Sequence, residues 1–352
     1  MDAMRPLSPA ELTRIIDRRG VCVTVYAETG PRAMLDDAIH EASLLLRREA
    51  DDATHTAVLD WLRDAAADIR TRVPGGAAIF ATATDLRVVP LESLPSAASG
   101  GTQVRLDDRF FVAPLLVDLQ SRIPVMVLAL SQNSVRLVDA SADPPRIVPV
   151  PGLPDSLRGF DALDLTNDRE TLAHLRTSEE PTIRERQYAH AIDRAIGEVL
   201  DPAALLVVAA AEPLAGLFAE SSSHDRLARP GIHGNADDMT PDELARAALP
   251  SVERERETVR DRELARLAEF PKRELVADRS AVILQAGRLG AIDTLYVDLD
   301  RPDEAAYVDE AARAAYADDA RIVSAQASEL PERGAAAAIL RYPVQPEPSE
   351  AG

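Results

Sequence analysis

The stretch Pro-Val-Met-Val-Leu-Ala-Leu-Ser, residues 124–131, decides the fold class of this chain. It is an almost unbroken apolar run of strand length, which is typical of a central strand buried on both faces of a sheet. Gln132-Asn133-Ser134 is typical of a turn, so Val135–Ala140 is expected to pair back as a hairpin. Further elements follow in an order that predicts an α/β unit. They are a strand over Arg146–Val150, a helix over Arg184–Leu200, a strand over Ala204–Ala209 and a helix starting within Glu212–Phe218.

The regions on either side alternate helices and strands in the same way. Upstream, apolar residues three and four apart predict two helices, and β-branched runs predict strands. Downstream, Thr240-Pro241-Asp242-Glu243 has the pattern of a capping box with proline at the first helical position. It therefore starts a long helix that ends near Phe270. The remaining predicted elements are strands over Val21–Tyr26, Ala77–Ala83, Leu86–Leu91, Ala291–Leu299, Arg321–Ala325 and Ala336–Tyr342, and helices over 33–49, 54–71, Leu275–Arg288 and 303–317.

The predicted elements group into three consecutive α/β domains. A run of small and polar residues, Ser96–Thr102, is typical of a linker. We therefore expect an N-terminal domain over 1–102, a middle domain over 103–229 and a C-terminal domain over 230–343. The last residues, 344–352, are rich in proline and glutamate and are expected to be a disordered tail.

The charge of the chain excludes some classes of partner. Of its 352 residues, 39 are basic and 59 acidic, which gives a formal net charge of -20. Such a surface repels a phosphate backbone, so no DNA partner is expected. No run reaches the ~18 apolar residues of a membrane span, and the N-terminus lacks the features of a signal peptide. With Cys22 as the single cysteine, we expect a cytoplasmic protein without disulfides or a membrane partner; the oligomeric state stays open.

No motif in the chain points to catalysis or to a cofactor. It contains no phosphate-binding glycine motif and no Gly-x-Ser-x-Gly nucleophile turn. The best metal candidates are His224 and His233 with Asp225 and Asp238, which lie in one predicted loop region. Loop histidines are common, however, and no cysteine assists them. We expect no catalytic residue, no metal and no cofactor.

One basic stripe stands out on this acidic chain. Arg186, His190 and Arg194 recur every four residues on the predicted helix over Arg184–Leu200, so they share one face. Because arginine suits bidentate phosphate contacts, these three residues are the candidate RNA or ribosome contact. The alternative is an ordinary solvated helix face. A second predicted helix, Ser251–Leu267, carries arginines whose field is diluted by interleaved glutamates: Arg256, Arg260 and Arg266.

Several short phrases occur in an order that resembles a known family. They are Val21–Tyr26, Phe80, Asp108-Arg109-Phe110 with Pro114-Leu115-Leu116, Leu128-Ala129-Leu130-Ser131-Gln132-Asn133 with Val135-Arg136-Leu137, Ala210–Leu217, Ile232-His233-Gly234-Asn235, Glu243-Leu244 and Gly334–Tyr342. Together they resemble the bacterial family related to the archaeal and eukaryotic peptide-chain release factors. The resemblance covers roughly residues 20–342.

The resemblance implies a decoding-type first domain, a ribonuclease-H-like middle domain, and a last α/β/α sandwich like that of kink-turn-binding ribosomal proteins. Release factors carry Gly-Gly-Gln in the middle domain, where its backbone helps water attack the peptidyl-tRNA ester. This chain has no Gly-Gly-Gln. The corresponding loop, expected within 155–184, contains a single glycine, Gly159. Gly100-Gly101-Thr102-Gln103 is a near match, which we interpret as linker. No catalytic residue is carried over from the family.

These observations predict a non-catalytic, translation-factor-like protein that binds the ribosome or tRNA in rescue, stalling or hibernation. One alternative is a peptidyl-tRNA or RNA hydrolase, which would need carboxylates that converge with Mg²⁺. The other is a stress-related protein-interaction module without RNA, which the net charge favours.

Overall fold

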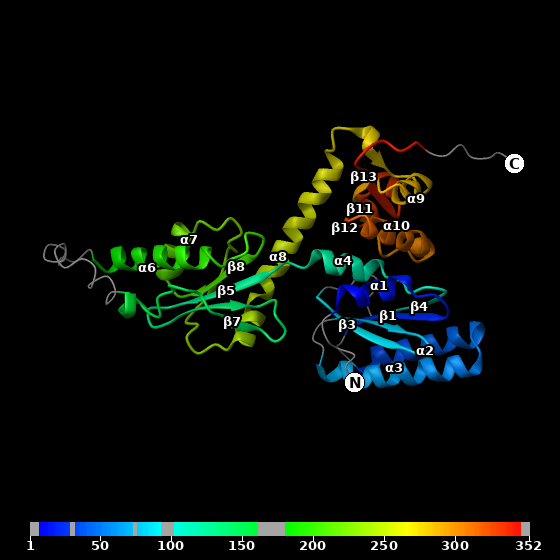
Figure 1. The fold of residues 1–352 in the computed structure, drawn as a ribbon, viewed down its shortest axis with the longest axis horizontal. Helices are drawn as coiled ribbons and strands as arrows, with labels where there is room; N and C mark the ends of the chain where they lie inside the picture. The colour runs from blue at the N-terminus through cyan, green and yellow to red at the C-terminus, as the bar shows by residue number, and fades with distance from the viewer. Residues whose placement is uncertain (1–6, 29–31, 73–75, 93–101, 161–179, 346–352) are drawn as a thin grey trace. The chain divides into compact units, whose positions relative to one another are not determined.

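The computed structural model divides the chain into two compact units. Unit 1 combines Met1–Arg122 with Arg260–Gly352, and unit 2 is Ile123–Val259. Within the described residues, unit 1 contains two sheets and unit 2 contains one (Figure 1), which confirms the α/β class. No helix in this part of the chain is long and apolar enough to cross a membrane. The structure describes residues 7–28, 32–72, 76–92, 102–160 and 180–345.

The first sheet of unit 1 is antiparallel throughout, with the strand order β3-β2-β1-β4. Its central strand β1 is buried along almost its whole length, as its β-branched composition predicts. The two predicted strands over Ala77–Ala83 and Leu86–Leu91 pair as an antiparallel hairpin, in which Gly76 pairs with Leu91 and Ala81 pairs with Leu86. The strands are β1 (Cys22–Glu28), β2 (Gly76–Ala81), β3 (Leu86–Leu91) and β4 (Thr102–Asp107).

Two long helices cover one face of the first sheet. They are α2 (Arg32–Glu49) and α3 (Asp52–Arg72), both predicted from their apolar spacing. Leu46 and Leu62 are buried in the same cluster as Val25 of β1. Truncating a buried leucine in such a cluster to alanine costs about 2–5 kcal/mol of stability. Burial of the apolar residues spaced three and four apart therefore holds the helices on the sheet.

The second sheet of unit 1 forms an α/β/α sandwich, as expected for the last domain. Its order is β10-β13-β11-β12, with β11 and β12 parallel and the other pairs antiparallel. Helices α9 and α10 pack on one face, and the end of α8 packs on the other through Leu267 and Tyr296. The elements are α8 (Pro241–Ala268), β10 (Val276–Ala277), α9 (Ser280–Arg288), β11 (Ile292–Val297), α10 (Ala305–Ala317), β12 (Arg321–Ser324) and β13 (Ala336–Leu340), with 3-10 turns at Arg273–Leu275, Pro302–Glu304, Ala327–Glu329 and Pro331–Arg333.

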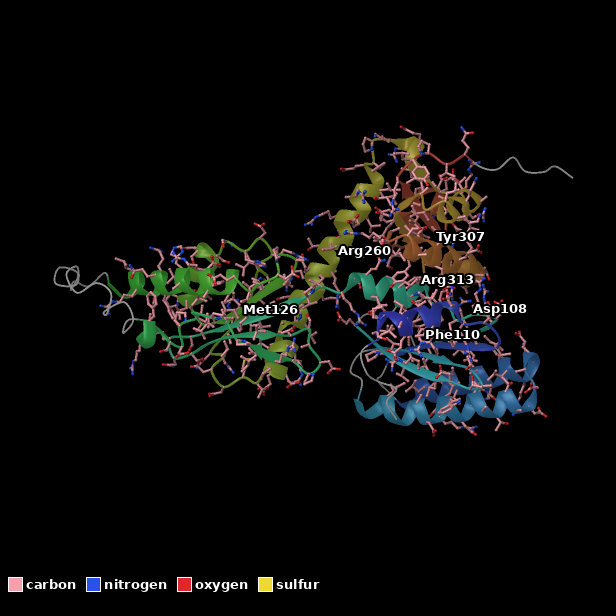
Figure 2. The ribbon with its side chains drawn as sticks, in the orientation of Figure 1. Asp108, Phe110, Met126, Arg260, Tyr307 and Arg313 are labelled. Carbon is pink, nitrogen blue, oxygen red and sulfur yellow. The ribbon has the colours of Figure 1, made fainter. Side chains whose placement is uncertain are left out.

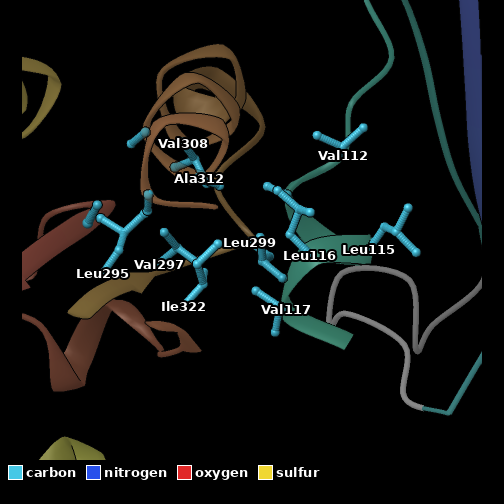
Figure 3. Close-up of a cluster of buried hydrophobic side chains, with 14 of the residues drawn as sticks. Val112, Leu115, Leu116, Val117, Leu295, Val297, Leu299, Val308, Ala312 and Ile322 are labelled. Atoms are coloured by element: carbon cyan, nitrogen blue, oxygen red, sulfur yellow. The ribbon is translucent and has the colours of Figure 1, made fainter. Parts of the chain in front are cut away.

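The two domains of unit 1 share one hydrophobic core. Helix α4 (Ala113–Ser121) lies within this core, together with Tyr26 of the first sheet. Figure 3 shows Leu116 of α4 on the side that faces Leu299 and Ile322 of the last domain. Because α4 contributes to the cores of both domains, the first and last domains pack as one body.

Unit 2 is a three-layer α/β domain around a five-stranded sheet of order β7-β6-β5-β8-β9. Strands β7, β6 and β5 are antiparallel, whereas β5, β8 and β9 are parallel. Helices α6 and α7 cover one face, and the first part of α8 covers the other. This order agrees with the expected ribonuclease-H-like organisation. The elements are β5 (Val125–Leu130), β6 (Val135–Asp139), β7 (Arg146–Val148), α6 (Glu180–Gly197), β8 (Leu205–Ala210), α7 (Leu214–Ser221) and β9 (Ile232–His233).

The first division of the chain lies further along than the expected boundary at residue 102. Strand β4 belongs to the first sheet, because its backbone pairs with β1 and places Gln103 opposite Tyr26. Helix α4 follows and packs into the core of unit 1, so the division falls after Arg122. The local sequence pattern does not reveal which sheet β4 joins or which core α4 packs into.

The second division also differs from the expected boundary at residue 229. Strand β9 pairs with β8, and Leu244 of α8 packs in the core of unit 2. The division therefore falls after Val259, inside α8. The helix predicted over Leu275–Arg288 is wrong at its start, because Val276 and Ala277 pair with β13. Helix α1 (Pro9–Asp17) was not predicted.

Candidate nucleic-acid interface

Helix α6 presents the predicted basic stripe on its outer face. Tyr188 and Ile192 point inward and are fully buried against the sheet of unit 2. Arg186, His190 and Arg194 lie on the opposite side and are exposed. The structure therefore places the three predicted site residues on one solvent-facing stripe; that they bind RNA or the ribosome stays a prediction.

Two acidic side chains of the same helix, Glu185 and Asp193, turn inward. Glu185 is 7% exposed and accepts a 2.9 Å hydrogen bond from the Gln132 amide. Asp193 is 8% exposed and accepts hydrogen bonds from the hydroxyl groups of Ser222 and Ser223 at 3.0 and 2.9 Å. Because these carboxylates face the interior, the outer face of α6 is locally basic on an acidic protein.

One carboxylate outside α6 contacts the stripe. Glu220 of α7 lies 3.9 Å from the Arg186 guanidinium, and both side chains are more than half exposed. An exposed ion pair at this distance contributes about 0–1 kcal/mol, so a phosphate group can displace it. Arg186 is therefore accessible to a polyanion despite this neighbour.

The three arginines that the sequence singled out on α8 are engaged by the protein itself. The Arg256 guanidinium lies 3.5 Å from the Glu253 carboxylate. Arg260 donates to Glu329 at 2.5 Å and to the Ser324 carbonyl at 3.2 Å. Arg266 donates to Asp293 at 2.7 Å, and this contact raises the pKa of Arg266. Partners within the chain thus occupy the second candidate helix, which leaves α6 as the better basic surface.

A polar cluster at the β5–β6 turn was not predicted. The Asp237 carboxylate accepts hydrogen bonds from the hydroxyls of Ser131 and Ser134 at 2.5 and 2.7 Å, and from the Asn133 amide at 3.2 Å. The hydrogen bond from Ser131, with the others, lowers the pKa of Asp237. Tyr188 of α6 donates to the Ser131 carbonyl at 3.1 Å, so the turn is tied to the helix that bears the stripe.

The metal candidates do not converge on one another in the way a metal site requires. His224 Nε2 lies 2.7 Å from the Ala204 carbonyl, where the ring acts as a hydrogen-bond donor. His233 is exposed on β9. Across the described ranges, no group of three or more histidine, cysteine or acidic residues is placed to hold a metal ion.

A family model matches the middle of the chain. Residues 124–256 match the model of bacterial archaeo-eukaryotic release factor family 11. This region is release-factor-like. The resemblance found in the sequence is thereby confirmed, and the matched residues include all the described strands of unit 2 and helix α6 with its stripe. No curated protein matches the chain.

Solved structures of translation factors are also similar to the chain. Archaeal translation termination factor aRF1 shares 15% identity, with 94% of this chain and 96% of that chain covered and a TM-score of 0.25. Pelota of Archaeoglobus fulgidus shares 13% identity, covering 76% and 80%, with a TM-score of 0.39. A model of ribosome-bound archaeal Pelota and ABCE1 shares 14% identity, covering 95% and 93%, with a TM-score of 0.42.

The release-factor-like region lacks the Gly-Gly-Gln motif in its sequence. Most of the segment where the motif was expected, 161–179, lies outside the described residues. The near match is not simply a linker: Gly100 and Gly101 lie outside the described residues, but Thr102 and Gln103 start β4 in the sheet of unit 1. Pairing with β1 commits their backbone to that sheet, so they do not form an exposed loop of the release-factor-like region.

Proposed function

We propose that this chain is a non-catalytic, translation-factor-like protein of the cytoplasm that binds the ribosome or tRNA through α6. Rescue, stalling or hibernation during stress is the setting in which such a factor acts. The proposal rests on the charge of the outer face of α6. On the described part of α6, the arginines at 184, 186 and 194 are exposed, while Glu185 and Asp193 are buried.

Contact with RNA depends on the local charge of α6 rather than on the net charge of the chain. The net charge of -20 opposes approach to RNA at long range. That repulsion is screened beyond a Debye length of about 8 Å at physiological salt, so a local basic strip can still make phosphate contacts. Residues four apart rise about 6 Å along a helix, so the stripe presents a row of donors that can follow one phosphate backbone. No phenylalanine, tyrosine or tryptophan stands among Arg186, Gln187, His190, Ala191 and Arg194, so we propose contact mainly with the backbone rather than with the bases.

The test is co-sedimentation of the full chain with ribosomes over a salt series. Two or three phosphate contacts predict a slope of about -1.4 to -2.7 for log K against log salt. The double variant Arg186→Glu with Arg194→Glu is expected to bind more weakly and to reduce this slope by about one per lost contact. Both residues are exposed, so the circular dichroism spectrum and the melting temperature should be those of the wild type.

A matched control separates the stripe from the net charge. Arg47→Glu with Arg63→Glu changes the total charge by the same amount on exposed positions of α2 and α3, in unit 1. This control should bind like the wild type. Equal loss in both double variants would mean that total charge alone governs binding. A wild type that never co-sediments would overturn the proposal and favour an interaction module without RNA, which the acidic composition supports.

A further inference from the structure

We infer that Asp309 and Arg313 of α10 form an interdomain lock, which joins the first and last domains of unit 1 at the backbone of residues 110–113. This segment, here called the junction, connects β4 to α4. The pair lies within one helix, yet most of its hydrogen bonds run to the other domain. The inference concerns unit 1 and is independent of the function proposed for α6.

Arg313 is the donor side of the lock. It is 8% exposed and reaches out of α10 toward two backbone carbonyls of the N-terminal part of the chain. Its guanidinium donates to the carbonyl of Ile16, in α1, and to the carbonyl of Phe110, in the junction. Figure 2 shows Arg313 and Phe110 labelled near one another, at the level where α10 and the first domain meet.

Asp309 is the acceptor side of the lock. Its Oδ1 atom accepts from the backbone amides of Val112 and Ala113 at 2.6 and 2.9 Å. These amides open α4, and no side chain local to that helix start caps it. A carboxylate from another helix therefore satisfies donors that the first turn of any helix leaves free. The other oxygen, Oδ2, lies 2.6 Å from Arg313 Nε, and this ion pair fixes the orientation of the two side chains relative to each other.

Side chains of the first domain also bond to the junction. The Phe111 amide donates to Thr24 Oγ1 at 3.0 Å, and Tyr26 donates through its hydroxyl to the Phe111 carbonyl at 2.7 Å. The Arg105 guanidinium lies 4.7 Å from the centre of the Phe111 ring. Side chains of β1 and α10 thus satisfy the backbone groups of one short segment together, and neither domain does so alone.

A second tie sits at the far end of α4. Gln120 donates to the Ala320 carbonyl at 3.1 Å and accepts from the Ile322 amide at 2.7 Å, which attaches α4 to β12. Asp118 accepts from the Glu92 amide at 2.9 Å, which attaches α4 to the end of β3. Hydrogen bonds thus hold α4 to both domains. Of these ties, the lock at the start of α4 is the one in which two charged side chains of the last domain, Asp309 and Arg313, bond to the backbone of the N-terminal part of the chain, so we expect it to control the separation of the two domains.

The experiment is native-state hydrogen exchange of the full chain at rising urea. Arg313→Met removes the donors but keeps a long apolar chain, and Asp309→Asn keeps the shape but removes the charge. In both variants, exchange at Val112 and Ala113 is expected to rise at least tenfold more than exchange inside β2 and β11, which rises only as far as each domain as a whole is destabilised. If Arg313→Met does not fold, the same exchange measurement on the more conservative variant Asp309→Asn tests the lock.

A second readout follows the coupling of the two domains. Trp61, on α3, reports unfolding of the first domain by fluorescence, and exchange in β13 reports unfolding of the last domain. In the wild type both signals should be lost at one urea concentration, and in the variants at two. The matched control is Arg301→Met, because Arg301 bonds only to Glu304 and the Arg333 carbonyl in the described residues, both within the last domain. If both domains of the Arg313→Met variant still unfold together, or if Val112 and Ala113 exchange at the wild-type rate, the lock does not exist.

Discussion

Arg313 and Asp309 lie one helical turn apart on α10, with Arg313 Nε 2.6 Å from Asp309 Oδ2, and both side chains are almost fully buried. Burial raises the pKa of the Asp309 carboxyl, and this shift is opposed by Arg313 and by the backbone amides of Val112 and Ala113. A buried ion pair adds little net stability, because desolvation offsets the attraction. Loss of one partner is costly, because it leaves the other charged and buried.

The first prediction concerns the stability of unit 1. Arg313→Ala should lower the free energy of unfolding by about 3–5 kcal/mol at pH 7, since Asp309 is left as an uncompensated buried charge. Urea unfolding followed by Trp61 fluorescence measures the change. A double replacement, Asp309→Asn with Arg313→Met, should cost less than the sum of the two single replacements, because it leaves no unpaired charge. Strictly additive losses would contradict this account.

The cost of Arg313→Ala should shrink at acidic pH. A carboxyl group whose pKa is higher in the folded than in the unfolded protein destabilises the fold once it is ionised. This loss of stability develops as pH rises from the unfolded-state pKa through the folded-state pKa. Without Arg313 the pKa of Asp309 rises further. At pH 4 the variant should therefore lie closer to the wild type than at pH 7, and a difference that grows on acidification would be inconsistent with this.

The single thiol should be unreactive in the folded protein. Burial raises the pKa of Cys22 to about 11, and the side chain is fully enclosed in β1. At pH 8 only about one thiol in a thousand is then ionised, and the thiolate is the reactive species. Labelling with a chromogenic disulfide reagent should be at least tenfold slower in buffer than in urea. Complete labelling of native protein within minutes would show that β1 opens readily.

The Asp237 cluster should stabilise unit 2 above the acid range. Its hydrogen bonds from Ser131, Ser134 and Asn133 depress the pKa of Asp237. A depressed carboxyl pKa stabilises the fold above the unfolded-state value, and this contribution is lost as pH falls through the folded-state value. Asp237→Asn should therefore lower the melting temperature of the release-factor-like region at pH 7 but not at pH 2. Asp238→Asn, at the neighbouring exposed carboxylate, is the control and should show neither effect.

We predict no hydrolysis of peptidyl-tRNA. The chain contains no Gly-Gly-Gln, and Gln103 of the near match is committed to the first sheet. Purified protein added to stalled ribosome complexes should release peptide no faster than buffer. Release that survives Gln103→Ala would point to another residue, and release abolished by that change would reverse our interpretation of this segment.

Chelation should leave the protein intact. His224 is engaged by the Ala204 carbonyl, and His233 is exposed on a short edge strand. EDTA should not change the melting temperature or the circular dichroism spectrum. A fall of several degrees that Zn²⁺ or Mg²⁺ restores would contradict the expectation and would direct mutagenesis to His224, His233 and Asp238.

Local chemistry was enough to predict much of the fold. The apolar run at 124–131 became the central strand β5, because a strand buried on both faces needs no polar alternation. The capping box was also predicted, and Thr240 and Glu243 form it reciprocally at 3.3 and 2.8 Å. The four-residue spacing of Arg186, His190 and Arg194 placed them on one helix face, because helical periodicity is a property of the chain itself.

Other features were decided only by the tertiary structure. The sequence does not show that Glu185 and Asp193 face inward while their arginine neighbours face water; the sheet and α7 decide this by offering hydrogen bonds on one side of α6. It also does not show that β4 pairs with β1, because an edge strand of mixed polarity matches several sheets equally well.

The sequence by itself determined the α/β class, most of the helices and strands, the release-factor resemblance and the position of the basic stripe. Only the tertiary structure decided where the chain divides and what joins its ends. Asp309 and the amide of Val112 lie far apart in sequence, and their contact depends on the packing of two complete domains. Residues near in sequence constrain one another through backbone geometry, whereas such distant pairs meet only when burial of a shared core compensates the loss of chain entropy.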